Sequence, residues 1–166
     1  SANSVMIEGK KGIIIIDTLS TYESAKNVLK EFRKITDKPV KTIIYTSGNL
    51  EQVGGTRAFL EEGDGKVEIV AHENNLDFYV NQNIIMGQTT GLRNQYATGS
   101  FLPEEGPDKS NIKYLDKNQT STISYVPPTN TFSNKYELDI SEVKMSLIHI
   151  GDESSDQIYI WFPDDK

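Results

Sequence analysis

The sequence predicts a layered α/β domain, because strand-like and helix-like segments alternate along its first half. Four consecutive isoleucines, Ile13 to Ile16, predict a strand that is buried on both faces and is central in a sheet. Apolar side chains then recur at three- and four-residue steps from Tyr22 to Phe32, which predicts a helix ending near Ile35. Residues 40–45 predict the next strand. This order favours helices packed on a largely parallel sheet.

The following elements continue the alternation. Ser20 and Glu23 have the spacing of a capping box, which predicts the start of the first helix. A short helix is expected at 57–62, a third strand at 68–71 and a further helix at 76–85.

The second half of the chain has a different character. Residues 88–120 are rich in glycine, serine, asparagine, glutamine and charged side chains, so we expect a long loop or lid there. Strands are predicted at 136–140, 144–150 and 158–162, and Ser141-Glu142 suits a hairpin turn between the first two. We expect residues 1–166 to form one domain.

Composition excludes several classes of function. Seventeen basic and twenty-four acidic side chains give a net charge of −7, which opposes binding to phosphate backbones, so no nucleic-acid partner is expected. The longest apolar run is far shorter than a membrane span, and no signal peptide is recognisable, so we expect a soluble chain of unknown location. Without cysteine, there are no thiolate metal ligands or cysteine nucleophiles.

Compact catalytic motifs are absent, and the individual candidates each have a structural alternative. His72 and His149 are either weak metal ligands or structural side chains. Asp17, at the end of the isoleucine strand, is either a catalytic acid or a hydrogen-bond partner of a neighbouring loop. The acidic run at 152–156 is either part of a metal site or a solvated turn.

The segment from Thr46 to Gly55, TSGNLEQVGG, follows a strand and opens a helix. It resembles the Thr-His-x-His-x-Asp-His-x-Gly-Gly motif of the metallo-β-lactamase superfamily, and Asp17-Thr18 fits the same frame. The sequences at 71–74, at 127–129 and from 149 onward resemble the zinc-dependent alkyl sulfatases in particular. The resemblance implies an αββα sandwich, of which this chain corresponds to the first half, and two zinc ions in an intact site.

The resemblance places Ser47, Asn49 and Gln52 at the three histidine positions and Glu51 at the aspartate position. Serine hydroxyls and amide oxygens are poor zinc ligands, so we expect no catalytic residues, metal or other cofactor. Weak candidate ligands remain. They are Glu51, Glu153 and His149.

We therefore expect a domain that has lost zinc binding and hydrolase activity and serves as a structural or interaction module or the remnant of a split enzyme. Two alternatives stay open: an active alkyl or aryl sulfatase completed by a partner chain, and a non-catalytic module that binds amphiphiles. Half a sandwich leaves one sheet face uncovered, so we also expect a homodimer or a complementary chain to cover it.

Overall fold

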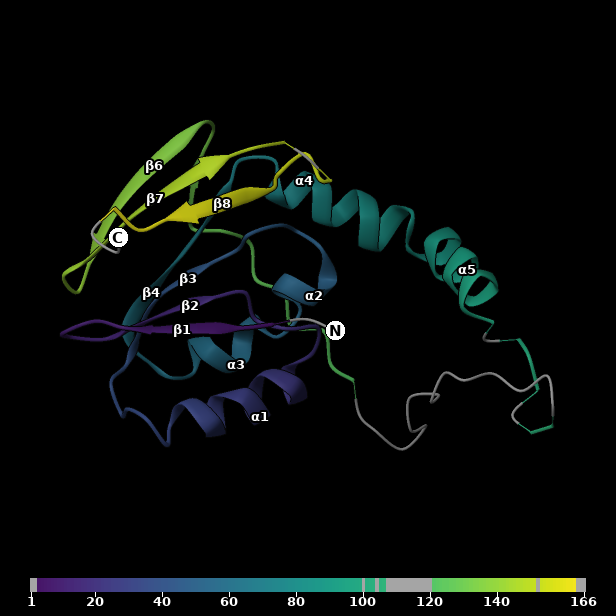
Figure 1. Cartoon of the computed structure of the whole chain (residues 1–166), viewed down its shortest axis with the longest axis horizontal. Coiled ribbons are helices and arrows are strands. Elements are labelled where there is room, and N and C mark those ends of the chain that lie inside the picture. Colours follow the sequence, from purple (N-terminus) through teal and green to yellow (C-terminus); the bar gives the residue numbers. More distant parts are fainter. Residues whose placement is uncertain (1–2, 100, 104, 107–120, 152, 164–166) are drawn as a thin grey trace.

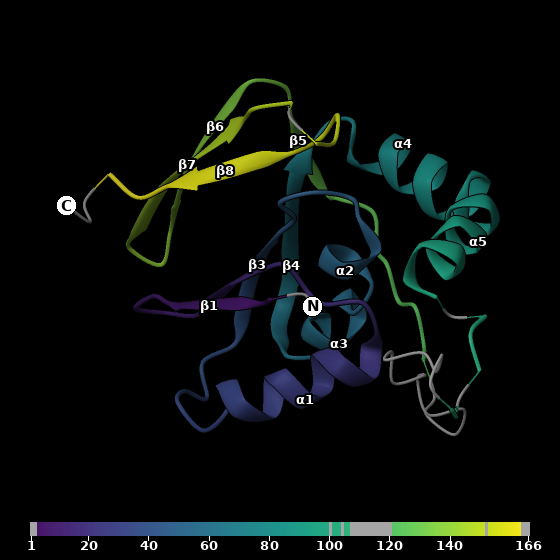
Figure 2. The ribbon, with the colours of Figure 1, turned by 45° about the vertical axis from the view of Figure 1, so that its right-hand side comes forward.

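The structure is a computed structural model that describes residues 3–99, 101–103, 105–106, 121–151 and 153–163. Within these ranges, eight strands form two sheets, whose arrangement is shown in Figures 1 and 2. The larger sheet has the strand order β1-β2-β3-β4-β5, with β1 antiparallel to β2 and the other neighbours parallel. Its strands are β1 (Val5–Glu8), β2 (Ile13–Ile16), β3 (Val40–Ile44), β4 (Gly63–His72) and β5 (Asn130–Phe132).

The smaller sheet is an antiparallel meander of β6 (Lys135–Ile140), β7 (Val143–His149) and β8 (Ile158–Trp161). Ser141 and Glu142 connect β6 to β7 with φ angles of 53° and 68°. Positive φ at both central residues is typical of a type I′ turn, whose twist matches that of the flanking strands. The predicted hairpin is confirmed.

The helices lie on one face of the larger sheet and at one end of it. Figure 1 shows α1 and α3 below this sheet, the smaller sheet above it, and α4 and α5 extending to the side. The predicted α/β layering is therefore confirmed. The helical segments are α1 (Tyr22–Phe32), α2 (Leu50–Val53), α3 (Thr56–Leu60), α4 (Asn75–Tyr79), the π-helical η1 (Val80–Ile85) and α5 (Gly87–Thr98). Within the described ranges, none of these is long and apolar enough to span a bilayer.

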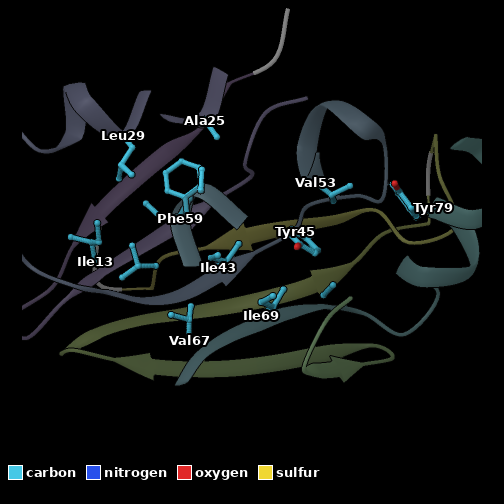
Figure 3. Close-up of a cluster of buried hydrophobic side chains, with 14 residues drawn as sticks. Ile13, Ala25, Leu29, Ile43, Tyr45, Val53, Phe59, Val67, Ile69 and Tyr79 are labelled. Carbon is cyan, nitrogen blue, oxygen red and sulfur yellow. The ribbon is translucent and has the colours of Figure 1, made fainter. Parts of the chain in front are cut away.

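Strand β2 contributes to a hydrophobic core on each side of the larger sheet. Ile13 and Ile15 belong to the core between the larger sheet and helices α1 and α3. Figure 3 shows Ile13 in this cluster with Leu29 and Phe59. Ile14 belongs to the other core, which fills the space between the two sheets. All three isoleucines are fully buried, as the unbroken isoleucine run predicted.

The helix start was predicted one residue too early. Thr21 is the N-cap of α1: its side chain accepts a hydrogen bond from the Ser24 N–H, and the Thr21 N–H donates to the Ser24 hydroxyl. Glu23 is engaged elsewhere, because its carboxylate accepts hydrogen bonds from the backbone and hydroxyl of Thr122. The helix ends at Phe32, and a turn replaces the last residues of the predicted helix.

The expected loop at 88–120 is wrong over its first part, where α5 runs to Thr98. None of the residues of α5 is buried, so the apolar periodicity that would predict a helix from sequence is missing. Residues 107–120 lie outside the described residues, and a lid there stays a prediction. Strands β1 and β5 were not predicted, because both are short.

Candidate functional site

The loop between β3 and α2 carries Ser47, the first of the four predicted ligand positions, in a buried environment. Its side chain is engaged on several sides. The Ser47 oxygen lies 3.1 Å from the Ser154 hydroxyl, accepts a 3.1 Å hydrogen bond from the Asn49 side-chain amide, and lies 3.4 Å from Asp156 Oδ1. Ser47 is only 4% exposed. The position that would hold a histidine is thus part of a closed polar network.

Asp156 is the centre of this network and is 1% exposed. Its Oδ2 accepts a 2.6 Å hydrogen bond from the Gly48 N–H and a 2.8 Å hydrogen bond from the Asn75 amide. These donors compensate for part of the solvation that the carboxylate loses on burial. The network joins the loop after β3, helix α4 and the loop between β7 and β8.

Gly54 and Gly55 are needed because two backbone segments come very close at this point. A Cβ on Gly54 would lie 2.0 Å from the Ser20 carbonyl oxygen, and one on Gly55 would lie 2.2 Å from that of Thr18. The approach is fixed by hydrogen bonds from the Gly55 N–H to the Leu19 oxygen and from the Thr18 N–H to the Gln52 oxygen. The Gly-Gly pair of the motif therefore has a packing role that does not depend on a metal.

Asp17 bonds to the loop after β3, so the predicted hydrogen bond to a neighbouring loop is present. Its two carboxylate oxygens accept hydrogen bonds of 2.8 and 2.6 Å from the backbone N–H and the hydroxyl of Thr46. Burial raises the pKa of Asp17 to about 7, against the two Thr46 hydrogen bonds, and the nearby charge of Asp156 adds to the increase. Asp17 also has a left-handed backbone with φ of 58°, which aspartate tolerates better than most residues.

His72 and His149 stack on each other where the two sheets meet, with ring centroids 3.8 Å apart. His72 Nδ1 accepts a hydrogen bond from the Asn74 N–H, so its proton sits on Nε2, which donates to the Ser133 carbonyl at 2.8 Å. His149 Nε2 lies 3.1 Å from the Ser155 carbonyl. Both rings therefore serve as structural contacts between β4 and β7.

The remaining predicted ligands are not gathered into one cluster. Glu51, on α2, and Glu153, in the loop before β8, are exposed, whereas His149 stacks on His72. Gln52 Oε1 is buried and accepts no hydrogen bond within the described part of the chain. There, no three histidine or acidic side chains come close enough together to hold a metal ion. The groups at the three histidine positions are a hydroxyl and two amides, which do not fit zinc, and the carboxylate of Glu51 is the one motif group that does.

Asn75 and Asn83 belong to the site but were missed at the sequence level. Asn75 holds Asp156, and Asn83 donates hydrogen bonds of 3.2 and 3.1 Å to the carbonyls of Gly48 and Tyr79. No motif marks either residue, because each is an asparagine in a helical segment whose other signals are the apolar side chains that predict the helix. The one usable signal was the family resemblance at 71–74, which ends directly before Asn75.

A cavity of about 510 Å³ lies beside the motif, between α2 and the segment from α4 to α5. Asn49 and Glu51 form its motif side, and Gln82, Asn83 and Asn94 belong to the opposite wall. A cavity of this size can hold a small organic molecule.

The fold and the motif together define the class of protein. The sequence model of the metallo-beta-lactamase superfamily matches residues 1–166, and the chain belongs to this superfamily.

Within it, the chain is similar to alkylsulfatases. It is 33% identical to a linear primary-alkylsulfatase from Pseudomonas sp. over 97% of this chain and 31% of that protein. The alkyl/aryl-sulfatase BDS1 from Saccharomyces cerevisiae is 29% identical, over 99% of this chain and 26% of that protein. The structure of the inverting sec-alkylsulfatase Pisa1 from Pseudomonas sp. superposes with a TM-score of 0.77 at 26% identity, covering 98% of this chain and 27% of Pisa1. The chain thus spans about a third or less of the length of these relatives.

The raised pKa of Asp17 gives the first prediction. The folded chain keeps a proton on Asp17 up to a pH of about 7, whereas the unfolded chain releases it near 3.8. The resulting stabilisation is complete below pH 3.8 and is lost as the pH rises through 7. Asp17→Asn stays neutral and tolerates positive φ, so urea unfolding should show its stability rising relative to the wild type between about pH 5 and about pH 8.

The exposed, similarly neutralised variant Asp139→Asn should show a much smaller change over the same pH range. Parallel pH profiles for Asp17→Asn and the wild type would contradict the assignment.

The histidine stack gives a prediction of the opposite sign. Burial, together with the adjacent His149, lowers the pKa of His72 below 6.5. Since the unfolded chain then binds the proton more readily, stability is complete above pH 6.5 and falls as the pH drops through the lower folded value. His72→Gln should lose less stability than the wild type when unfolding is compared at about pH 8 and about pH 5.5. Equal losses in the two proteins would rule out this role for His72.

Proposed function

We propose that this alkylsulfatase-like domain binds no zinc at the motif and does not hydrolyse sulfate esters by itself. The observation that carries the proposal is the network around Ser47 and Asp156. At the first ligand position, the Ser47 hydroxyl is already engaged by Ser154 and by the Asn49 amide. A metal ion would have to displace these contacts and would gain only a neutral oxygen from Ser47.

The loss of imidazole also removes the chemistry that zinc would supply, which is to activate a water molecule and stabilise the charge that develops on the ester. No residue of the described motif replaces this function. Asp17 is the nearby acidic group, since the charge of Asp156 contributes to its raised pKa, but both of its carboxylate oxygens already accept hydrogen bonds from Thr46. We infer a structural or interaction module, or the remnant of a split enzyme.

A second candidate is an active sulfatase that a further chain completes. In its favour, Gln52 Oε1 is a buried acceptor that has no hydrogen-bond partner among the described residues. Glu51 and Glu153 are both exposed, so they are available as metal ligands beside further ligands from a second chain.

Zinc content and sulfatase turnover of the same sample test the proposal. After zinc supplementation and dialysis, elemental analysis of the purified chain should find far less than one equivalent of zinc, and octyl sulfate should remain intact. A variant carrying Ser47→His, Asn49→His, Glu51→Asp and Gln52→His restores the family's motif ligands. It should retain more zinc, because imidazole is a far better ligand than hydroxyl or amide.

Stoichiometric zinc in the unmodified chain, with or without turnover, would refute the proposal. If turnover appears only after a complementary fragment of a relative is added, the second candidate is correct.

The core between the two sheets is open along one margin, which supports a proposal about partners. A cavity of about 560 Å³ lies there, and most of its lining is apolar. Its lining residues are Val5, Ile7, Ile16, Glu142, Val143, Lys144 and Phe162. We propose that a second copy of the chain covers this margin, because exposed apolar surface next to a core is stabilised by burial.

Light scattering on the full chain should therefore give the mass of a dimer. Val5→Lys places a charge in the open margin, where Val5 is 48% exposed, and should shift the equilibrium towards monomer. Leu76→Lys is the matched control, since Leu76 is 43% exposed but lies on α4, outside this cavity. A monodisperse monomer of the unmodified chain would contradict the proposal.

A further inference from the structure

The cavity beside the motif has an unusual charge pattern for a domain similar to alkylsulfatases. Among the residues that the structure describes, its lining contains one carboxylate, that of Glu51, and no lysine, arginine or histidine. A sulfate ester would meet no positive charge there once zinc is absent. The net charge of −7 on the whole chain adds to this repulsion, because the surrounding potential favours cations.

The carboxamide groups of the lining are biased towards accepting hydrogen bonds. Asn83 uses its side-chain nitrogen for two bonds, to the carbonyls of Gly48 and Tyr79. Asn49 uses its nitrogen to donate to Ser47. The carbonyl oxygens of Asn49 and Asn83 are thus the groups that these two side chains can best offer to a ligand, and Glu51 adds a charged acceptor.

Apolar side chains make up another part of the lining. Leu50, Ile84 and Ile123 all contribute, and the latter two are 64% and 55% exposed. The helix wall leaves space because it contains two glycines. A Cβ added to Gly91 would meet no atom within 4 Å, and one added to Gly87 would meet only the Gln82 oxygen at 3.9 Å. An alkyl chain could pack in this part of the cavity.

The backbone that forms this wall is also unusual. Residues Val80–Ile85 form a π-helix, a rare conformation that occurs frequently at functional sites. Asn83 lies within this π-helical turn and connects it to the loop after β3 through Gly48.

We propose that this cavity binds amphiphilic organic cations. A primary ammonium group would bind to Glu51 and the carbonyl oxygens of Asn49 and Asn83, while a short alkyl chain packs against Leu50, Ile84 and Ile123. The inference rests on the proposed absence of zinc, since a zinc ion at the motif would reverse the charge of the site. The ligand would then be a cationic amphiphile, whereas alkyl sulfates are anionic amphiphiles.

Calorimetric titration of the full chain with three octyl probes, each below its micelle concentration, tests the proposal. Octylammonium should bind saturably with one site, whereas octyl sulfate and octyl glucoside should bind much more weakly. Glu51→Gln should weaken octylammonium about tenfold, because a charge-assisted hydrogen bond is replaced by a neutral one. Asp139→Asn changes the net charge equally at an exposed site outside the cavity and should leave the affinity unchanged.

A second pair of variants tests the location without removing a charge. Gly91→Leu fills the open space beside the helix and should abolish binding of octylammonium. Gly91→Ala improves the helix propensity in the same way but adds only one carbon, so it should retain binding. Equal affinity for octyl sulfate, or no effect of Glu51→Gln and Gly91→Leu, would overturn the proposal.

The zinc measurement separates this failure from failure of the proposed function. A zinc-free chain that does not bind octylammonium contradicts only the inference about the cavity. A chain that retains zinc stoichiometrically and prefers octyl sulfate contradicts both.

Discussion

The buried carboxylate of Asp156 holds together three segments that are far apart in the sequence. It accepts hydrogen bonds from Gly48, in the loop after β3, and from Asn75, at the start of α4, while its own residue lies in the loop before β8. A side chain that is 1% exposed loses most of its hydration, so removal of either donor would deprive the buried carboxylate of a hydrogen bond that water cannot replace. The geometry of the whole site therefore depends on this one group.

The same network explains how the domain can retain its architecture without the metal ligands of the superfamily motif. Two glycines let the Thr18–Ser20 segment pack directly on the residues that follow α2, and the two oxygens of Asp17 fix Thr46. These contacts are made by backbone groups, by short hydroxyl and amide side chains, and by the carboxylates of Asp17 and Asp156. They position the loop whether or not a metal is present, so the sequence changes at the ligand positions do not require a change of fold.

Much of the fold could be predicted from the sequence because its signals are local. The isoleucine run of β2 reflects burial on two faces and the alternating pattern of β6 reflects burial on one face, whereas the central strand β7 buries Met145, Ser146 and Leu147 in succession. Helix α5 gave no such signal, since it buries no residue, and β5 is defined by its pairing with β4 and by little else. At the start of α1, Ser20 and Thr21 are both possible N-cap residues. The contact of Glu23 with Thr122 takes Glu23 away from a capping box with Ser20, so it favours Thr21 as the N-cap.

The site was less predictable, because its key residues act through distant partners. In the sequence, Asp156 belongs to an acidic, serine-rich segment, a pattern that favours a solvated turn. In the structure, its carboxylate is buried and binds the N–H of Gly48, which lies 108 positions earlier in the sequence. The family resemblance located the loop at Ser47 and Asn49, but it indicated only that these residues are not the histidines of the motif. It did not indicate which contacts they make. What they form instead is a closed network next to an acceptor-rich cavity, in whose described lining Glu51 is the one charged side chain, and this follows from contacts between segments. The proposed loss of zinc would also leave the neighbouring cavity with a negative bias, so the changes that we propose to oppose hydrolysis would at the same time favour a cationic ligand.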